Sequence, residues 1–152
     1  MEIANHVFLG DSREVLKTFP EDVVNTTVTS PPYYNLRDYG TENQIGLEDS
    51  LEEYIEQLCL VFDEVYRVTK DDGTFWLNIG DCYARGGQIN SDGRRGFSGA
   101  KGLGYREKKV DGLTDKDLIG VPWRLAFELQ KRGWILRSDI IWAKLNPMPE
   151  SC

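Results

Sequence analysis

The sequence predicts one α/β domain in which short apolar strands alternate with amphipathic helices. A β-branched run over residues 23–29 has the composition of a strand. A capping box that begins at Ser50 precedes apolar residues at helical spacing, and a second apolar run over residues 74–79 follows a turn signal at 70–73. The length of 152 residues, with 40% hydrophobic and 28% charged residues, is that of one ordinary globular domain.

The first third of the chain is expected to contain two strands with a short helix between them. Residues 3–9 read as a strand, and Ser12 is placed to cap a helix over residues 13–19. Residues 23–29 read as a buried central strand. Asp11 has two interpretations: a second helix-capping carboxylate, or an acid at a strand end that holds the edge of a nucleoside.

The remainder of the chain is expected to add two helices and two strands. The helix after Ser50 directs apolar side chains, and Cys59, into the core: Leu51, Ile55, Leu58, Phe62 and Val65. A second possible capping box spans residues 114–117, Pro122 starts or kinks a helix, and Gly133 ends it. The last strand is predicted over residues 134–142, with the tryptophans packed in the core or on strand faces: Trp123, Trp134 and Trp142.

A diproline corner, Ser30-Pro31-Pro32-Tyr33, ends the central strand. Neither proline can donate to a strand ladder, and each fixes its own φ, so the corner is rigid and extended. In open α/β sheets, ligands bind at this end of the strands. The corner offers a hydroxyl, carbonyl oxygens and an aromatic ring. Asp81 follows the 74–79 strand at the same sheet edge, where it can shape a pocket or tie down the following loop.

The charge of the chain is unevenly distributed. The net charge is −7, yet residues 94–109 contain only one acid and six basic residues: Arg94, Arg95, Lys101, Arg106, Lys108 and Lys109. The rest of the chain has 12 basic and 24 acidic residues. These lie in a glycine-rich loop, residues 86–113. A basic loop on an acidic body fits a localised contact with phosphates, and equally a solvated surface loop.

Several classes of protein do not match the composition. No apolar run reaches membrane-spanning length, and the N-terminus lacks a signal-peptide pattern. The three scattered cysteines favour reduced thiols and a cytoplasmic location. With one histidine and no cluster of ligands, no metal site is expected.

Six motifs follow one another along the chain: Gly-Asp-Ser at residues 10–12, the Ser-Pro-Pro-Tyr corner, and residues 78–81, 117–124, 133–142 and 146–151. In this order they resemble the N-terminal, catalytic half of the β-class amino-group DNA methyltransferases. The resemblance covers nearly the whole chain, although Leu145 stands where relatives usually carry proline. It implies a Rossmann-like methyltransferase sheet, incomplete in this chain, with about four strands and flanking helices.

The resemblance also implies a reaction: transfer of a methyl group from S-adenosylmethionine to the N4 amine of cytosine or the N6 amine of adenine in double-stranded DNA. Ser30 Oγ and the Pro31 carbonyl would accept hydrogen bonds from the amine, with Pro32 completing the corner. Tyr33 would stack on the flipped base. Asp11, Ser30 and Pro31 would contact the cofactor. Serine in the first position of the Ser-Pro-Pro-Tyr motif favours cytosine as the target base.

The cofactor motif of the family, Phe-x-Gly-x-Gly, does not occur in the sequence. We therefore expect a fragment of a longer polypeptide, one subunit of a split enzyme, or a truncated product. The partner would be the missing half, a complementing chain or a second copy. The alternative is an inactive remnant that binds DNA or a complementing chain. A third hypothesis is an α/β binding module unrelated to the methyltransferases, in which Ser-Pro-Pro-Tyr is only a turn that ends a strand. It requires that the ordered motifs occur together by accident. The expected setting is restriction-modification in a bacterium, an archaeon or a phage.

Overall fold

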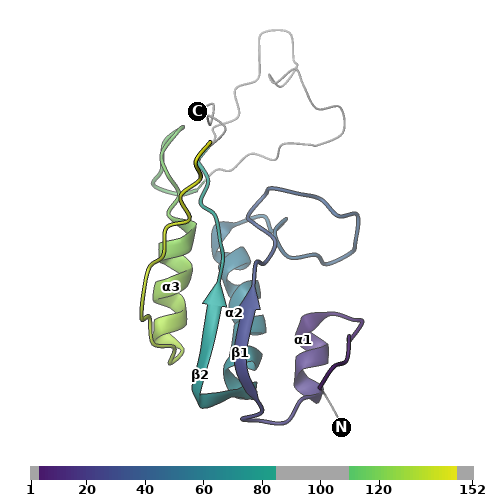
Figure 1. The fold of residues 1–152 in the computed structure, drawn as a ribbon. Helices are drawn as coiled ribbons and strands as arrows, with labels where there is room; N and C mark the ends of the chain where they lie inside the picture. The colour runs from purple at the N-terminus through teal and green to yellow at the C-terminus, as the bar shows by residue number, and fades with distance from the viewer. Residues whose placement is uncertain (1–3, 85–109, 147–152) are drawn as a thin grey trace.

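A βαβ unit forms the centre of the fold. The computed structural model describes residues 4–84 and 110–146 (Figure 1). Along the chain these residues form α1 (Ser12–Val15), the 3₁₀ turn η1 (Leu16–Thr18), β1 (Val24–Thr29), α2 (Leu51–Val68), β2 (Thr69–Leu77) and α3 (Val121–Lys131). β1 and β2 pair in parallel, and α2 is the crossover between them.

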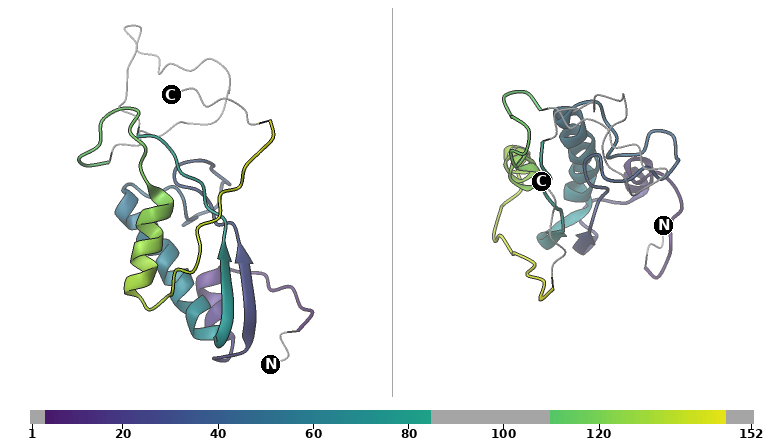
Figure 2. Two further views of the ribbon diagram at one scale, coloured as in Figure 1. Left: turned by 60° about the vertical axis from the view of Figure 1, so that its left-hand side comes forward. Right: turned by 90° about the horizontal axis from the view of Figure 1, so that it is seen from above.

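All three helices lie on one side of this two-stranded sheet (Figure 2). α2 covers the sheet and is flanked by α1 and α3. Phe75 and Leu77 of β2 face the helices and pack against the buried core. On the opposite face, Val28 and Trp76 are paired in register and are 76% and 52% exposed. The predicted strand before Ser30 is therefore confirmed as a strand, but the expectation that it is buried and central is wrong for the described residues. None of its residues is fully buried, and it is one of two strands with a single face covered.

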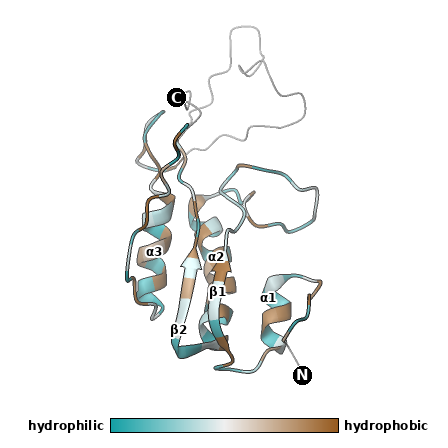
Figure 3. Cartoon of the chain, viewed as in Figure 1, coloured by the Kyte–Doolittle hydropathy of each residue, from teal (hydrophilic) through white to brown (hydrophobic). Residues whose placement is uncertain are grey.

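The predicted capping box starts α2. Ser50 Oγ accepts from the Glu53 amide at 3.2 Å, and the Glu53 carboxylate accepts from the Ser50 amide at 3.3 Å. The apolar positions of α2 and α3 are interrupted by hydrophilic ones, as amphipathic helices require (Figure 3). Leu51, Leu58 and Cys59 of α2 are buried as predicted. Burial raises the pKa of the Cys59 thiol to about 11.

Two predicted strands do not form in the described residues. Residues 4–9 and 134–142 make no strand, and their apolar side chains are mostly exposed, such as Leu9, Ile141 and Trp142. The physical reason is pairing: a strand needs backbone hydrogen bonds to a neighbour, and in the described part of the chain neither segment pairs with β1 or β2. The expectation of four strands is thus wrong for the described residues, which form two.

The turn expected over residues 70–73 is also wrong, because β2 begins at Thr69 and runs through these residues. Val24 pairs with Thr69 and Thr26 pairs with Thr74, so residues 70–73 are accommodated by an irregularity in the register opposite Asn25. Close packing accompanies it, since a Cβ built on Gly73 would lie 3.1 Å from the Asn25 carbonyl oxygen.

The start of α3 differs in one respect from the prediction. Residues 114–117 form a turn, in which Asp117 accepts from the amide and hydroxyl of Thr114, and not a helix cap. Gly120, in the left-handed region at φ 77°, precedes α3, and Pro122 lies in its first turn as expected. Gly133 follows the helix at φ 102°.

The tryptophans divide between core and surface. Trp134 packs against Tyr66 and Phe75, with ring centroids 5.0 and 4.8 Å away. The expected packing is confirmed for Trp134. It is wrong for Trp123 and Trp142, which are 48% and 77% exposed because no element of the described chain covers them.

Candidate active site

The diproline corner leaves the carboxyl end of β1, between the sheet and the loop that leads to α2. Thr29, the last residue of β1, accepts a hydrogen bond at 2.9 Å from the amide of Asn78, just past β2. The two strands are therefore still joined where the corner begins. Beyond this point Ser30 is exposed, whereas Pro31 and Pro32 are half-buried.

The structure brings Ser30, Tyr33 and Gly80 together. Ser30 Oγ donates to the Tyr33 hydroxyl at 3.3 Å, a long contact for two hydroxyl groups. The Tyr33 ring rests on Gly80: a Cβ built there would lie 3.0 Å from Cε2 of the ring. Gly80 follows β2, so the end of the second strand supports the aromatic side chain that follows the first.

Two further contacts hold the corner on its inner side. The buried Tyr54 of α2 donates its hydroxyl to the Pro32 carbonyl at 2.8 Å. Gly46 approaches so closely that a Cβ on it would lie 3.0 Å from the Tyr33 carbonyl oxygen, and its φ of 106° favours glycine. The sequence prediction missed Tyr54, although its position three residues after Leu51 places it on the apolar face of the helix.

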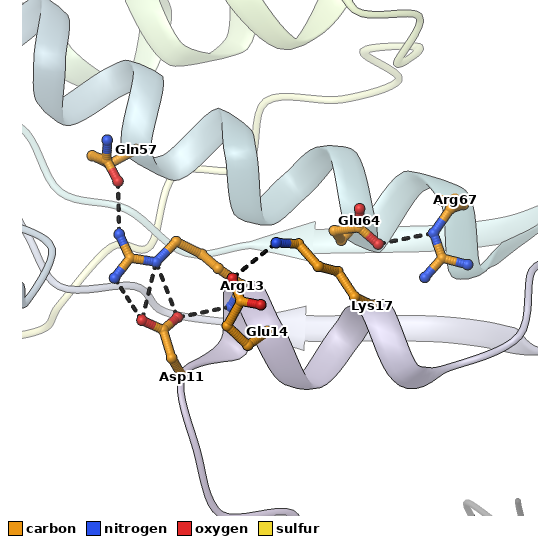
Figure 4. A network of polar contacts seen from close by, with 7 residues as sticks. All are labelled: Asp11, Arg13, Glu14, Lys17, Gln57, Glu64 and Arg67. Atoms are coloured by element: carbon orange, nitrogen blue, oxygen red, sulfur yellow. Dashed lines mark hydrogen bonds and ion pairs between the residues drawn. The ribbon is translucent and has the colours of Figure 1, made fainter.

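Asp11 caps α1 and forms an ion pair at the same time (Figure 4). Its carboxylate accepts from the Arg13 amide at 2.9 Å and from Arg13 Nε at 3.0 Å. Arg13 Nη1 also donates to Gln57 of α2 at 2.7 Å, so the network joins α1 to α2. The cap is Asp11, and not Ser12 as expected, because helix α1 begins at Ser12 itself.

Hydrogen bonding from Arg13 holds the pKa of the Asp11 carboxyl below its ordinary value of about 3.8. The Asp11 side chain remains 43% exposed, which leaves carboxylate oxygen accessible to a further donor. Arg13 and Gln57 also line an open depression of about 790 Å³ beneath the loop that precedes α2, together with Asn43 and Glu48. The cofactor contact expected of Asp11 stays a prediction.

Asp81 ties the end of the β2 segment to α3. Its carboxylate accepts from the amides of Gly120 and Val121, each at 3.0 Å, and from its own neighbour Cys82 at 2.9 Å. The first amides of a helix have no partner within the helix, and here a carboxylate from a distant segment satisfies them. Of the two interpretations of Asp81, the contacts support the tethering one.

The basic residues expected to contact DNA lie outside the described residues: Arg94, Arg95, Lys101, Arg106, Lys108 and Lys109. Among residues 4–84 and 110–146, no group of three or more His, Cys, Asp or Glu side chains is arranged to hold a metal ion. No helix in these ranges is both long and apolar enough to cross a bilayer.

The geometry is that of a parallel α/β unit with a polar and aromatic corner at the carboxyl end of its sheet. The model of the N6/N4 DNA methylase family matches residues 24–152. This match covers the corner and everything after it, so the chain belongs to the DNA methylase family.

Similar proteins include two curated methyltransferases. The Type II methyltransferase M.SmaI of Serratia marcescens is 50% identical over 145 residues, which are 95% of this chain and 49% of that protein. M.Cfr9I of Citrobacter freundii is 48% identical over 151 residues, covering 95% of this chain and 48% of the relative. The chain thus spans about half the length of the curated relatives it matches.

Among solved structures, a putative DNA modification methylase from Thermus thermophilus resembles this fold with a TM-score of 0.51. The two are 27% identical, and the match covers 82% of this chain and 39% of that protein. The Thermus protein was crystallised with S-adenosyl-L-methionine.

Proposed function

We propose that this chain is the catalytic half of a DNA methyltransferase that transfers a methyl group from S-adenosylmethionine to the exocyclic amine of a flipped base, cytosine N4 or adenine N6. The observation that carries the proposal is the corner itself. In a chain of the DNA methylase family, an exposed Ser30 hydroxyl and a half-buried Tyr33 ring meet at the carboxyl end of β1.

The chemistry asks for hydrogen-bond acceptors. The lone pair of an exocyclic amine is delocalised into the base, so the nitrogen is a poor nucleophile. Ser30 Oγ and the Pro31 carbonyl would accept from its two N–H bonds. They bind more strongly as the nitrogen becomes tetrahedral and its protons more acidic. S-Adenosylmethionine, when bound, supplies the methyl group on a sulfonium, and the amine loses one proton to water.

The residues expected to hold the base and the cofactor fit these roles. Gly80 supports the Tyr33 ring from beneath, so a base can stack on the exposed part of the ring without displacing it. The exposed carboxylate of Asp11 can accept from a hydroxyl or amine of the cofactor while its contact with Arg13 holds it in place. Ser30 and Pro31 would complete this contact.

The test is transfer of a labelled methyl group from S-adenosylmethionine to DNA that carries many restriction sites. The purified chain is assayed alone and together with the C-terminal half of M.SmaI, a relative with 50% identity. We expect transfer in the mixture, and its loss in Ser30→Ala combined with Tyr33→Ala. Ser138→Ala, the same change at an exposed serine, is the control. Transfer that survives the double substitution would refute the assigned site.

The product identifies the base. Nucleoside analysis of the methylated DNA distinguishes N4-methylcytosine from N6-methyladenine. Because Ser30 occupies the first position of the corner, we expect N4-methylcytosine. N6-methyladenine would contradict the choice of base but not the class of enzyme.

A second candidate role, association with a complementing chain without catalysis, is favoured by the uncovered sheet. Val28 and Trp76 are exposed on the face opposite α2, and Ile140, Ile141 and Trp142 are exposed in the last described segment. We propose that the polypeptide matching the other half of the relatives covers this surface. Val28→Asp should then abolish co-elution of the two halves. Leu60→Asp, at an exposed apolar residue of α2 on the other side of the sheet, should leave co-elution unchanged.

A further inference from the structure

We infer that Tyr54 is a positioning residue for methyl transfer, which holds the diproline corner through a hydrogen bond from its hydroxyl to the Pro32 carbonyl. The inference rests on the proposed function, since the corner is its proposed catalytic element. The contact measures 2.8 Å and joins the first turns of α2 to a residue 22 positions earlier in the chain.

The corner needs a donor from elsewhere. Pro31 and Pro32 have no N–H groups, so the corner can accept hydrogen bonds but cannot donate any from these two residues. Their rings fix both φ angles, which leaves the two ψ angles as the soft torsions. A donor bound to the Pro32 carbonyl restrains the second of these, and with it the direction of the adjacent peptide that carries the Pro31 carbonyl.

Tyr54 is a well-supported donor. Its side chain is fully buried, with 0% of the residue exposed, and its ring packs 5.2 Å from that of the buried Tyr34. The capping box of Ser50 and Glu53 anchors the start of α2 immediately before it. Burial also raises the pKa of the Tyr54 hydroxyl well above its usual range, so the group is a protonated donor at neutral pH.

The ring and the hydroxyl of Tyr54 have separable roles. A phenylalanine would fill the same space between α2 and the corner, but it could not restrain the carbonyl. The proposed Pro31 acceptor must point at an amine proton. A misdirected carbonyl would stabilise the transition state less than a correctly directed one, even if the base still binds.

The test compares Tyr54→Phe with Tyr66→Phe in the mixture of halves described above. Tyr66 lies on the same helix and is 49% exposed, so it controls for loss of a hydroxyl from α2. For Tyr54→Phe we expect kcat to fall roughly tenfold to a hundredfold, the scale of a misplaced reacting group. The KM for DNA should stay within about twofold, since the stacking contact of Tyr33 is unchanged.

Rescue separates positioning from packing. Replacing Tyr54 by 4-aminophenylalanine retains the ring and an N–H donor, and should restore much of the lost kcat. A Tyr54→Phe protein with wild-type kcat, or with the loss confined to KM, would overturn the inference and leave the proposed function standing.

A second measurement does not depend on activity. In protein labelled with ¹³C-proline, the Pro32 carbonyl shift should move upfield in Tyr54→Phe and not in Tyr66→Phe, because a carbonyl released from its donor is less polarised. An unchanged shift would refute the restraint. If the wild-type mixture transferred no methyl group, the proposed function would fail, and the shift would still decide whether Tyr54 holds the corner.

Discussion

At the scale of residues, three close contacts hold the diproline corner and the segment after β2 in place. Tyr33 rests on Gly80, the Pro32 carbonyl accepts from Tyr54, and Asp81 bridges to the start of α3. Each joins segments far apart in the sequence. Alternation and helical periodicity report which face a residue occupies, but they carry no information on its partner across the fold. Ser30 and Tyr33 could be chosen from the sequence because they belong to the Ser-Pro-Pro-Tyr motif. Tyr54 could not, because no local pattern names its partner.

Substituting Gly80 by alanine should disturb Tyr33. The new Cβ would lie 3.0 Å from the ring, so the ring must move. If Tyr33 stacks on the flipped base as proposed, methyl transfer should fall about tenfold or more, the scale of a misplaced reacting group. Steady-state kinetics on Gly80→Ala measure this. In a Tyr33→Ala background the same substitution should have little further effect, and full additivity of the two losses would show that Gly80 acts by another route.

Substituting Asp81 by alanine should destabilise the chain. The amides of Gly120 and Val121 would lose their acceptor, at a cost of about 1–3 kcal/mol for partly buried groups. Urea unfolding of Asp81→Ala against the wild type measures the change. Asp117→Ala, which removes a carboxylate from an exposed turn, should cost less. Equal losses in the two variants would argue against the tether.

At the scale of elements, the βαβ unit was largely predictable. The capping box at Ser50 and the β-branched run before Ser30 are local signals, and α2 and β1 follow them. Residues 4–9 and 134–142 carry equally strong strand patterns, yet they form no strand in the described chain. Strand formation depends on a partner, and a helix does not, which explains why the helices were predicted more accurately than the sheet.

The link between α1 and α2 should weaken in acid. Arg13 lowers the pKa of Asp11, so the charged carboxylate stabilises the folded state above its ordinary pKa of about 3.8. This contribution is lost as the pH falls through the lower, folded-state pKa. Asp11→Asn keeps a capping side chain but removes the charge. It should be slightly less stable than the wild type at pH 7. The difference should shrink as the pH falls below about 3.8 and vanish below the folded-state pKa of Asp11.

Urea unfolding across this pH range provides the measurement. High salt at pH 7 offers a control, since the pair is partly exposed and should be screened. A difference between wild type and Asp11→Asn that persisted in acid would assign the effect to capping geometry instead of charge.

At the scale of the whole molecule, the helices of the described residues lie on one side of the sheet, and none of these residues covers Val28 and Trp76 on the other side (Figure 2). Exposed apolar side chains such as Val28 and Trp76 are costly to leave in water. The chain also spans about half of its curated relatives. Both facts agree with the proposal that a further polypeptide covers this face of the sheet.

The charge distribution leads to a prediction about DNA. Residues 94–109 carry a net charge of +5 within a chain of −7. If they contact phosphates, replacing Arg94, Arg95, Lys108 and Lys109 by glutamine should flatten the salt dependence of DNA affinity. The slope of log K against log salt would fall by up to about 0.9 per lost contact.

Fluorescence anisotropy at several salt concentrations measures the slope. Lys17→Gln with Lys131→Gln, which removes cations paired with acids on α1 and α3, should leave it unchanged. An unaltered slope in the quadruple variant would exclude the basic segment from the interface.

The sequence alone determined the local features of this protein. These are the capped helix after Ser50, the strand before Ser30, and the stiff corner whose prolines restrict the backbone wherever they occur. The tertiary structure adds which contacts hold that corner and that Asp81 ties the segment after β2 to α3. It also shows that residues 4–9 and 134–142 form no strand in the described part of the chain. The reason is that capping and proline geometry act between neighbours in the chain, whereas pairing and support require a partner from another segment.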